Sequence, residues 1–297
     1  MKVKKGYDEK IFLSISYLMV TLFAVCCLLP FYLILVGSFT KESVILTEGY
    51  KLWITIKDFS MEAYQMAFKS PDAIVRAYGI TIFVTVVGTV IAVILSAMTG
   101  YVLARPDFPW RNKISFFFFF TTLFSGGLVP WYLMCSKFFK FNNHIYSLIL
   151  PGLFSVWNMI ISKSFMKGIP YEMTEAAKVD GANDFCTFWK IILPTAKPLV
   201  ATIGLFTALT YWNDWYNCML FMSTGENWNL QYTLQNILNS SEAIKRIASM
   251  TGMQVGQIPS EGLKLAMTVI ATGPIIFLYP FLQKYFVKGM TIGAVKG

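Results

Sequence analysis

The side chains that could bind a small ligand gather in one stretch of this sequence, over 211–217. The candidates there are Tyr211, Trp212, Asn213, Asp214, Trp215 and Asn217. Aromatic faces stack on the C–H faces of a sugar, while amide and carboxylate groups bind its hydroxyls. An aromatic belt at a membrane surface would use the same residue types. Asp214 favours a binding site, because an acid at membrane depth indicates function by default. Asn158, beside Trp157, is a further candidate.

Residues for catalysis, metal binding or redox chemistry are sparse. The five cysteines form no Cys-x-x-Cys pair and have no metal-type spacing with the single histidine, His144. Four of them lie in or beside apolar stretches, where cysteine is a small buried hydrophobe. The apolar stretches hold no histidine cluster and no paired carboxylates, and Asp214 is the only acid well inside them. The sequence predicts no metal site and no catalytic residue, so a membrane enzyme is the least favoured class.

The composition indicates a membrane protein. Of 297 residues, 56% are hydrophobic and 14% are charged, whereas soluble domains carry roughly 25% charged residues. A spanning helix needs about 20 apolar residues. Six stretches qualify and predict one all-α, polytopic domain over 1–297. The predicted spans are 11–36, 78–103, 115–135, 145–165, 199–221 and 265–287.

Two of the six predicted spans contain residues that disturb a helix. The third includes Ser125-Gly126-Gly127 and Pro130, and the fourth includes Pro151, Gly152 and Asn158. Irregular backbone at membrane depth is tolerated only where protein or a water-filled cavity surrounds it. We expect a kink or break in the third span, which makes it either a pore-lining element or a packing kink.

The distribution of basic residues predicts the orientation. With the N-terminus inside, the cytoplasmic segments are 1–10, 104–114, 163–198 and 284–297. Together they carry 15 Lys and Arg, against 10 in the longer outer segments 37–77, 136–144 and 222–264. Both termini are therefore predicted to be cytoplasmic. The net charge of +9 is explained by topology, and nucleic-acid binding is not needed.

A charged, turn-containing segment over 170–194 separates the fourth and fifth predicted spans. Pro170 suits a helix start, and Gly181 is placed to end that helix in a left-handed conformation. A second short helix is expected over 183–192, leading to Pro194. An amphipathic helix on the membrane surface is the alternative, but such helices want a basic face. Residues 172–184 hold four acids and one lysine, so docking to a soluble partner is favoured, with Ala176 and Ala177 as a smooth contact face.

The spacing in this hairpin resembles a family motif. Glu175-Ala176-Ala177, three residues, Gly181, nine residues and then Ile191-x-Leu193-Pro194 is similar to the motif of ATP-binding-cassette (ABC) importer permeases. Residues 30–32, 58–64 and the tail 286–297 resemble carbohydrate-type permeases. In particular, they resemble the maltose-transporter permease subunit that bears a C-terminal tail. Residues 126–133 resemble the oligosaccharide branch.

The resemblance implies a type I ABC importer permease fold with six transmembrane helices, in a bacterial cell membrane. It implies four kinds of partner besides lipid: a second homologous permease, two ATPase subunits, an extracellular solute-binding protein and an oligosaccharide. The chain has no Gly-x4-Gly-Lys-Ser/Thr loop, so ATP and Mg²⁺ would be bound by the partner ATPase and not by this chain.

The resemblance also assigns residues to roles. The ATPase-coupling residues would be Glu175, Ala176, Ala177, Asp180, Gly181, Ile191, Leu193 and Pro194. The residues of a tail that contacts the ATPase would be Lys288, Gly289, Gly293, Lys296 and Gly297. Two alternatives stay open: an importer permease for an amino acid or polyamine, and a free-standing secondary transporter or channel.

Overall fold

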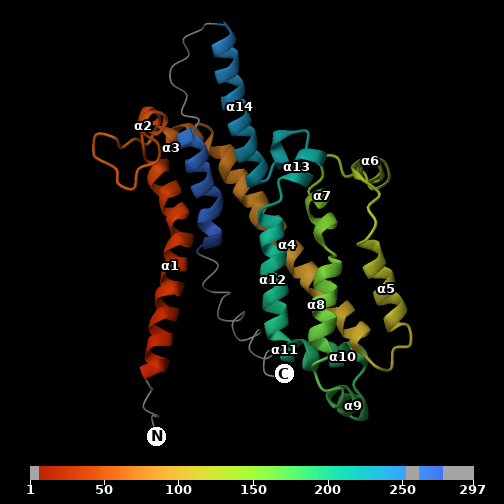
Figure 1. Ribbon diagram of the computed structural model, residues 1–297. Coiled ribbons are helices and arrows are strands. Elements are labelled where there is room, and N and C mark those ends of the chain that lie inside the picture. The colour runs from red at the N-terminus through yellow and green to blue at the C-terminus, as the bar shows by residue number, and fades with distance from the viewer. Residues whose placement is uncertain (1–6, 252–260, 277–297) are drawn as a thin grey trace. The chain divides into compact units, whose positions relative to one another are not determined.

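The computed structural model describes residues 7–251 and 261–276 (Figure 1). These residues are helical apart from turns and one isolated β-bridge between Thr40 and Phe59. They fall into two compact units. The first contains 7–70 with the described part of 236–273, and the second contains 71–235 with 274–276.

The first unit is built on the 32-residue helix α1, Tyr7–Ser38. The short helices α2 (Glu42–Glu48) and α3 (Glu62–Ala67) follow it, and the second half of α14 (Leu230–Thr251) and a helix over 261–276 also belong to this unit. The buried carboxylate of Glu42 accepts the backbone N–H groups of Glu261 and Gly262, at 3.0 and 2.9 Å. A carboxylate at a helix N-terminus satisfies free N–H groups and suits the helix dipole. Glu42 thus fixes the start of the last described helix.

The second unit is built on α4, Pro71–Ala104. The other long or central helices are α5 (Arg111–Thr121), α8 (Val156–Met166) and α12 (Lys197–Trp212). Shorter elements complete it: α6 (Leu128–Leu133), η1 (Met134–Phe138), α7 (Tyr146–Ile149), η2 (Leu150–Gly152), α9 (Glu172–Val179), α10 (Asp184–Thr187), η3 (Phe188–Ile192), α11 (Leu193–Thr195), α13 (Tyr216–Phe221), η4 (Gly225–Asn227) and the start of α14.

Helix α4 packs along both α8 and α12 (Figure 1). Its glycines let the neighbours approach closely: a Cβ on Gly88 would lie 2.5 Å from the Tyr211 ring, and one on Gly100 would lie 2.3 Å from Ser162 Cβ. Without a hydrophobic drive between helices in lipid, such close contacts between small residues supply the packing energy. At the end of the unit near α9, the buried core joins α4, α8, η3 and α12 through Tyr101, Met166, Phe188 and Leu199.

The six predicted spans are only partly matched by the described helices. Helices α1 and α4 each have the length and composition to cross a membrane. Two further crossings are possible if each of two bent pairs is one span: 146–152 with 156–166, bent by 48°, and 184–195 with 197–212, bent by 83°. The count of six is therefore not confirmed, and the second half of the sixth predicted span, from 277 on, lies outside the described residues.

The predicted break in the third span is confirmed. Helix α5 ends at Thr121, residues 122–127 are not helical, and α6 begins at Leu128. Gly127 has a φ of +83°, a conformation that glycine adopts without strain. The fifth predicted span is also interrupted, because α12 ends at Trp212 and α13 begins at Tyr216. A prediction of continuous helices would therefore be wrong for the third, fourth and fifth spans.

The packing of α4 predicts opposite effects of alanine at two of its glycines. Gly100→Ala would place its Cβ 2.8 Å from the Ser162 backbone carbonyl carbon. Because backbone cannot move aside cheaply, we expect a loss of about 1–3 kcal/mol in stability. Gly79→Ala meets nothing within 4 Å and should be neutral or stabilising by about 0.5–1 kcal/mol. Thermal unfolding of both variants in the same detergent measures this, and equal melting temperatures would contradict the packing account.

Candidate functional site

The hairpin between α8 and α12 turns at Gly181, as the sequence predicts. Gly181 has a φ of +79°. Its N–H donates to the Lys178 carbonyl at 3.0 Å, and the Ala182 N–H donates to the Ala177 carbonyl at 2.9 Å. This pair of bonds ends a helix by a Schellman motif, which satisfies carbonyls that the helix leaves free. Helix α10 then begins one turn later, where Asn183 Oδ1 accepts the Cys186 N–H at 2.7 Å.

One face of the hairpin is held against the core and the other is exposed. Glu175, Ala176, Asp180 and Gly181 are exposed, and Val179 is 88% exposed. The expectation that Ala176 and Ala177 form one outer face is corrected. Ala177 is only 3% exposed, because it lies one residue further around the helix, on the side that faces the protein. The outward surface is therefore centred on Glu175, Ala176 and Val179.

The second arm of the hairpin mainly anchors it. Ile191 and Leu193 are half-buried and pack on the core that contains Phe188 and Ile192. Pro194 is exposed. Of the three predicted coupling residues in this arm, two thus contact their own chain. They position the hairpin more than they extend its outer face.

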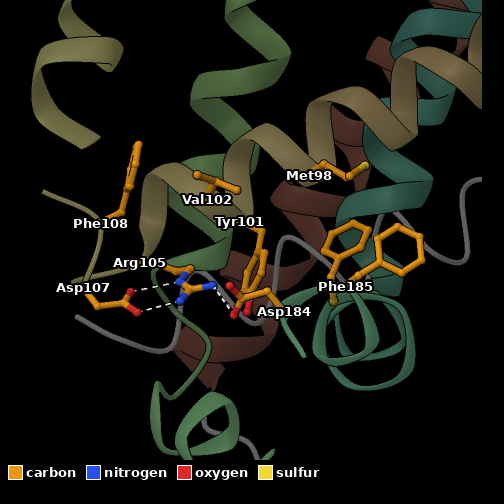
Figure 2. A pocket seen from close by; sticks show the side chains of 9 residues that line it. Met98, Tyr101, Val102, Arg105, Asp107, Phe108, Asp184 and Phe185 are labelled. Carbon is orange, nitrogen blue, oxygen red and sulfur yellow. Dashed lines mark hydrogen bonds and ion pairs between the residues drawn. The ribbon is translucent and has the colours of Figure 1, made fainter. Parts of the chain in front are cut away.

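Arg105, directly after α4, joins the two arms (Figure 2). Its Nε and Nη2 donate to the two carboxylate oxygens of Asp107, at 2.9 and 2.6 Å, and its Nη1 lies 2.6 Å from Asp184 Oδ1 in α10. Lys178 Nζ in α9 lies 3.0 Å from Asp107 Oδ2. The loop after α4 is therefore bonded to both α9 and α10. These four residues are called the loop–hairpin ion cluster below.

An apolar cleft of about 380 Å³ lies beside this cluster. Figure 2 shows Tyr101, Arg105, Asp107 and Asp184 at its charged end. The Arg105 guanidinium carbon lies 5.7 Å from the centre of the Tyr101 ring, within the range of a cation–π contact. Figure 2 also shows Phe108 and Phe185 on its lining.

In the sequence, Arg105 and Asp107 are recognisable only as charged residues of the predicted cytoplasmic segment 104–114. Their one local signal was position, because Arg105-Pro-Asp107 lies on the same predicted side of the membrane as the acidic hairpin. Opposite charges on one side do not specify which pairs form. The pairing depends on α4 and α8 packing side by side. This packing brings the loop after α4 into contact with α9 and α10.

Within the cluster, Asp107 and the two cations Arg105 and Lys178 stabilise one another's charged forms. Hydrogen bonds from Arg105 and then Lys178 hold the pKa of Asp107 well below its usual range. Hydrogen bonding to Asp107 and Asp184 raises the pKa of Arg105, and that to Asp107 raises the pKa of Lys178. Arg105, Asp107 and Lys178 thus stay charged over the physiological pH range. In the part of the chain that the structure describes, no group of three or more His, Cys, Asp or Glu could hold a metal ion.

Two of the predicted ligand-binding aromatics lie in the core. Tyr211 is 3% exposed, and its hydroxyl donates to the Ile149 carbonyl at 2.7 Å. Its ring lies against Gly88 and Gly152. Trp212 is 7% exposed, with its ring 6.4 Å from that of Tyr78. These two rings fill the space that the glycines leave, and their role in a substrate pathway stays a prediction.

The remaining residues of this stretch form the break between α12 and α13. Asp214 accepts the Asn217 backbone N–H at 3.1 Å and the Asn217 side-chain amide at 2.9 Å. The Asn229 side chain donates to the Asp214 carbonyl. Asp214 therefore caps α13. Asn213 is exposed and Trp215 is half-exposed, while Asp214 and Asn217 are partly buried.

Asn158 lines a groove of about 460 Å³ between α8 and α12. Its side-chain amide donates to Thr207 Oγ1 at 3.1 Å, and Trp157 beside it is 67% exposed. The other lining residues are Pro151, Gly152, Phe154, Ser155, Phe206, Thr207 and Thr210. The groove combines aromatic faces with hydroxyl and amide groups. It has no charged side chain in its lining.

A second cavity, of about 720 Å³, lies at the break in the third predicted span. It is lined by 121–122, 124–128, Pro130, Trp131, Met134 and Tyr216. The break thus borders open space, as a pore-lining element requires, but a packing kink at a protein surface has the same geometry. The predicted tail residues from Lys288 to Gly297 lie outside the described residues.

Comparison with known proteins shows the family. Residues 96–292 match the sequence family described as binding-protein-dependent transport system inner membrane component. The chain belongs to this family of membrane transport permeases.

Individual relatives match over nearly their full lengths. The polygalacturonan/rhamnogalacturonan transport system permease protein YtcP of Bacillus subtilis is 37% identical over 97% of this chain and 99% of the relative. Protein LplC of the same organism is 38% identical over 91% and 90%. The crystal structure of a bacterial ABC transporter for import of the acidic polysaccharide alginate matches with a TM-score of 0.78. It is 25% identical, covering 96% of this chain and all of that one.

The loop–hairpin ion cluster predicts a specific dependence of stability on pH. The pKa of Asp107 is lowered in the folded protein. Its contribution to stability is therefore fully present above the pKa of aspartate in the unfolded chain, about 3.9. This contribution to stability is lost as the pH falls from there through the lower pKa that Asp107 has in the folded protein. Asp107→Asn should lower stability by about 1 kcal/mol at pH 5 and pH 8 alike. The difference from wild type should narrow below about pH 4.

Melting temperatures across this pH range measure the effect. Glu226→Gln, an exposed acid of the same unit outside the cluster, is the control and should match wild type. A wild-type advantage that grows as pH falls would contradict the ion-pair account.

Proposed function

We propose that this chain is the permease subunit of an ABC importer that takes up an oligosaccharide. The observation that carries the proposal is the exposed hairpin. A tight glycine turn displays Glu175, Ala176 and Val179 to the outside, while ion pairs and core contacts hold its inner side. A surface of this acidic and small-residue composition suits a protein partner better than lipid.

The partner of this surface is an ATPase. The chain itself has no Gly-x4-Gly-Lys-Ser/Thr phosphate loop, and membership of a binding-protein-dependent transport family supports a multi-subunit importer. The assembly has a second homologous permease, two ATPase subunits that bind ATP and Mg²⁺, and an extracellular solute-binding protein. ATP binding shifts the complex between inward- and outward-facing states, and the hairpin transmits that shift.

The orientation follows from this assignment. With the hairpin in the cytoplasm, 15 of the 25 basic residues lie on the inner side, in agreement with the positive-inside rule. Both termini are then cytoplasmic and the tail 286–297 lies on the ATPase side. Six crossings satisfy this arrangement, with the broken helices of the second unit counted as interrupted spans.

Two observations support an oligosaccharide as the substrate. YtcP is named for polygalacturonan and rhamnogalacturonan transport, and the similar solved structure imports alginate. The groove at Asn158 also has the composition of a sugar site, with an exposed Trp157 beside amide and hydroxyl groups. An amino acid or polyamine would need charged groups, and the groove lining has none. Uptake assays with both solute classes separate these alternatives.

Replacing Gly181 tests the coupling role. Gly181→Val places a β-branched residue at φ +79°, which costs about 1–2 kcal/mol at that position and shifts the turn. We expect uptake of a labelled trigalacturonide by cells carrying the whole importer to fall at least about tenfold. Gly181→Asn is the matched control, because asparagine tolerates the left-handed conformation. Uptake by this chain without any ATPase subunit would overturn the importer proposal.

Replacing Trp157 tests the groove. Trp157→Ala removes an exposed aromatic face, worth about 0.5–1.5 kcal/mol in stacking. The KM for trigalacturonide uptake should rise about threefold to tenfold, with ATP hydrolysis in the absence of sugar unchanged. Trp110→Ala, a similarly exposed tryptophan outside the groove, is the control. Equal KM values for the two variants would remove the groove from the substrate path.

A further inference from the structure

The hairpin is connected along the chain to α8 and α12, but its ion pairs connect it to α4. Helix α4 precedes the hairpin in the sequence, and it meets the hairpin through the Tyr101–Phe188 ring contact and through the loop that begins at Arg105. A movement of the hairpin therefore reaches the end of α4 across these non-covalent contacts, in addition to the packing of α8 and α12 along α4. The nature of the contact decides whether α4 follows the hairpin.

The contact is made at two points and not at one. Arg105 bonds Asp184 in α10 and both oxygens of Asp107, and Asp107 in turn bonds Lys178 in α9. A single ion pair lets two segments pivot about it. Bonds to both arms of the hairpin resist rotation, and the two-point Arg–carboxylate geometry adds directional specificity.

An apolar layer stiffens the same contact. The Arg105 side chain is 13% exposed and lies over the ring of Tyr101. The Tyr101 ring lies 5.7 Å from that of Phe188, which is 3% exposed. Asp184, the partner of Arg105, is 61% exposed, so the Tyr101 ring shields the arginine side of the pair. The end of α4 and the second arm of the hairpin thus share one buried layer.

Helix α4 carries this connection to the ligand-facing end of the unit. From Ala104 to Gly88 the helix extends about 24 Å at 1.5 Å per residue. At Gly100 it abuts Ser162 of α8, and at Gly88 it abuts Tyr211 of α12. Tyr211 is followed directly by the break that holds Asp214. These contacts have no free space in which the helices could slide independently.

We infer that Arg105 is a positioning residue that makes the hairpin, α4, α8 and α12 move as one rigid body. This inference rests on the proposed function, because the ATPase supplies the movement. Force applied at Val179 and Ala176 tilts α4 through Arg105, and α4 shifts the groove at Asn158 and the break at Asp214 together. Without the cluster the hairpin moves on its own and ATP hydrolysis is uncoupled from uptake.

Distance measurements between spin labels test the inference without depending on the sugar. Labels at Lys190 on the hairpin, outside the outward surface, and at Val75 at the far end of α4 are both on exposed positions. For labelling, each of these two residues is replaced by cysteine in this chain after its five native cysteines have been replaced. The labelled chain is then assembled into the complete importer. Electron paramagnetic resonance then compares the nucleotide-free complex with the complex trapped by ATP and vanadate.

In the otherwise unmodified complex the Lys190–Val75 distance should be the same in both states, and in Arg105→Ala it should change between them. Asp184→Asn should act like Arg105→Ala, while Asp184→Glu should keep the wild-type behaviour. Arg76→Ala, an exposed arginine at the other end of α4, is the matched control. The ratio of trigalacturonide uptake to ATP hydrolysis should fall at least about fivefold in Arg105→Ala and Asp184→Asn alone.

Three results would overturn the inference, and they are distinguishable. If the ATPase binds and the distance in the unmodified complex changes as much as in Arg105→Ala, the rigid-body inference is wrong and the proposed function stands. If the assembled chain binds no ATPase, the proposed function fails and this inference fails with it. A loss of uptake with unchanged distances in Arg105→Ala would assign the cluster a purely structural role and overturn the inference as well.

Discussion

The close approach of α4 to α8 and α12 is the constraint on which the second unit depends. Gly88 and Gly100 bring the helices so near that a single added carbon would overlap Tyr211 or Ser162. Apolar side chains gain nothing by leaving lipid, so contact of this kind replaces the hydrophobic effect as the source of packing energy. The position of the loop after α4, and hence of Arg105, follows from it. A wider spacing would leave the acids of the hairpin without their partner.

The hairpin shows how a polar segment can be rigid beside a membrane. Its backbone groups are satisfied locally, by the Schellman bonds at Gly181 and the Asn183 cap. Its inner charges are satisfied by Arg105 and Asp107. What is left unsatisfied faces outward around Glu175, Ala176 and Val179. The division between a bonded inner side and a free outer side is what a docking element needs, since its partner must meet a preformed surface.

The broken helices of this unit fall where the cavities are. The chain leaves helical geometry at 122–127, at 153–155 and at 213–215. Residues of the first two breaks line cavities. Freed backbone groups at such depth need protein or cavity around them. At the third break, Asp214, Asn217 and Asn229 bond to one another. An acid that the sequence marks for ligand binding thus serves first to hold a helix start.

Some features of this protein are decided locally, and these the sequence alone determines. The apolar stretches of α1 and α4, the glycine break at 127, the turn at Gly181 and the family motif each depend on neighbours in the chain. Other features depend on contacts between distant segments. Burial of Ala177, Tyr211 and Trp212, the pairing of Arg105 with Asp184, and the capping of a late helix by Glu42 were set by tertiary structure. The reason is physical: backbone conformation and hydropathy are properties of short segments. Which face of a helix is covered, and which charges meet, is settled only when whole helices pack.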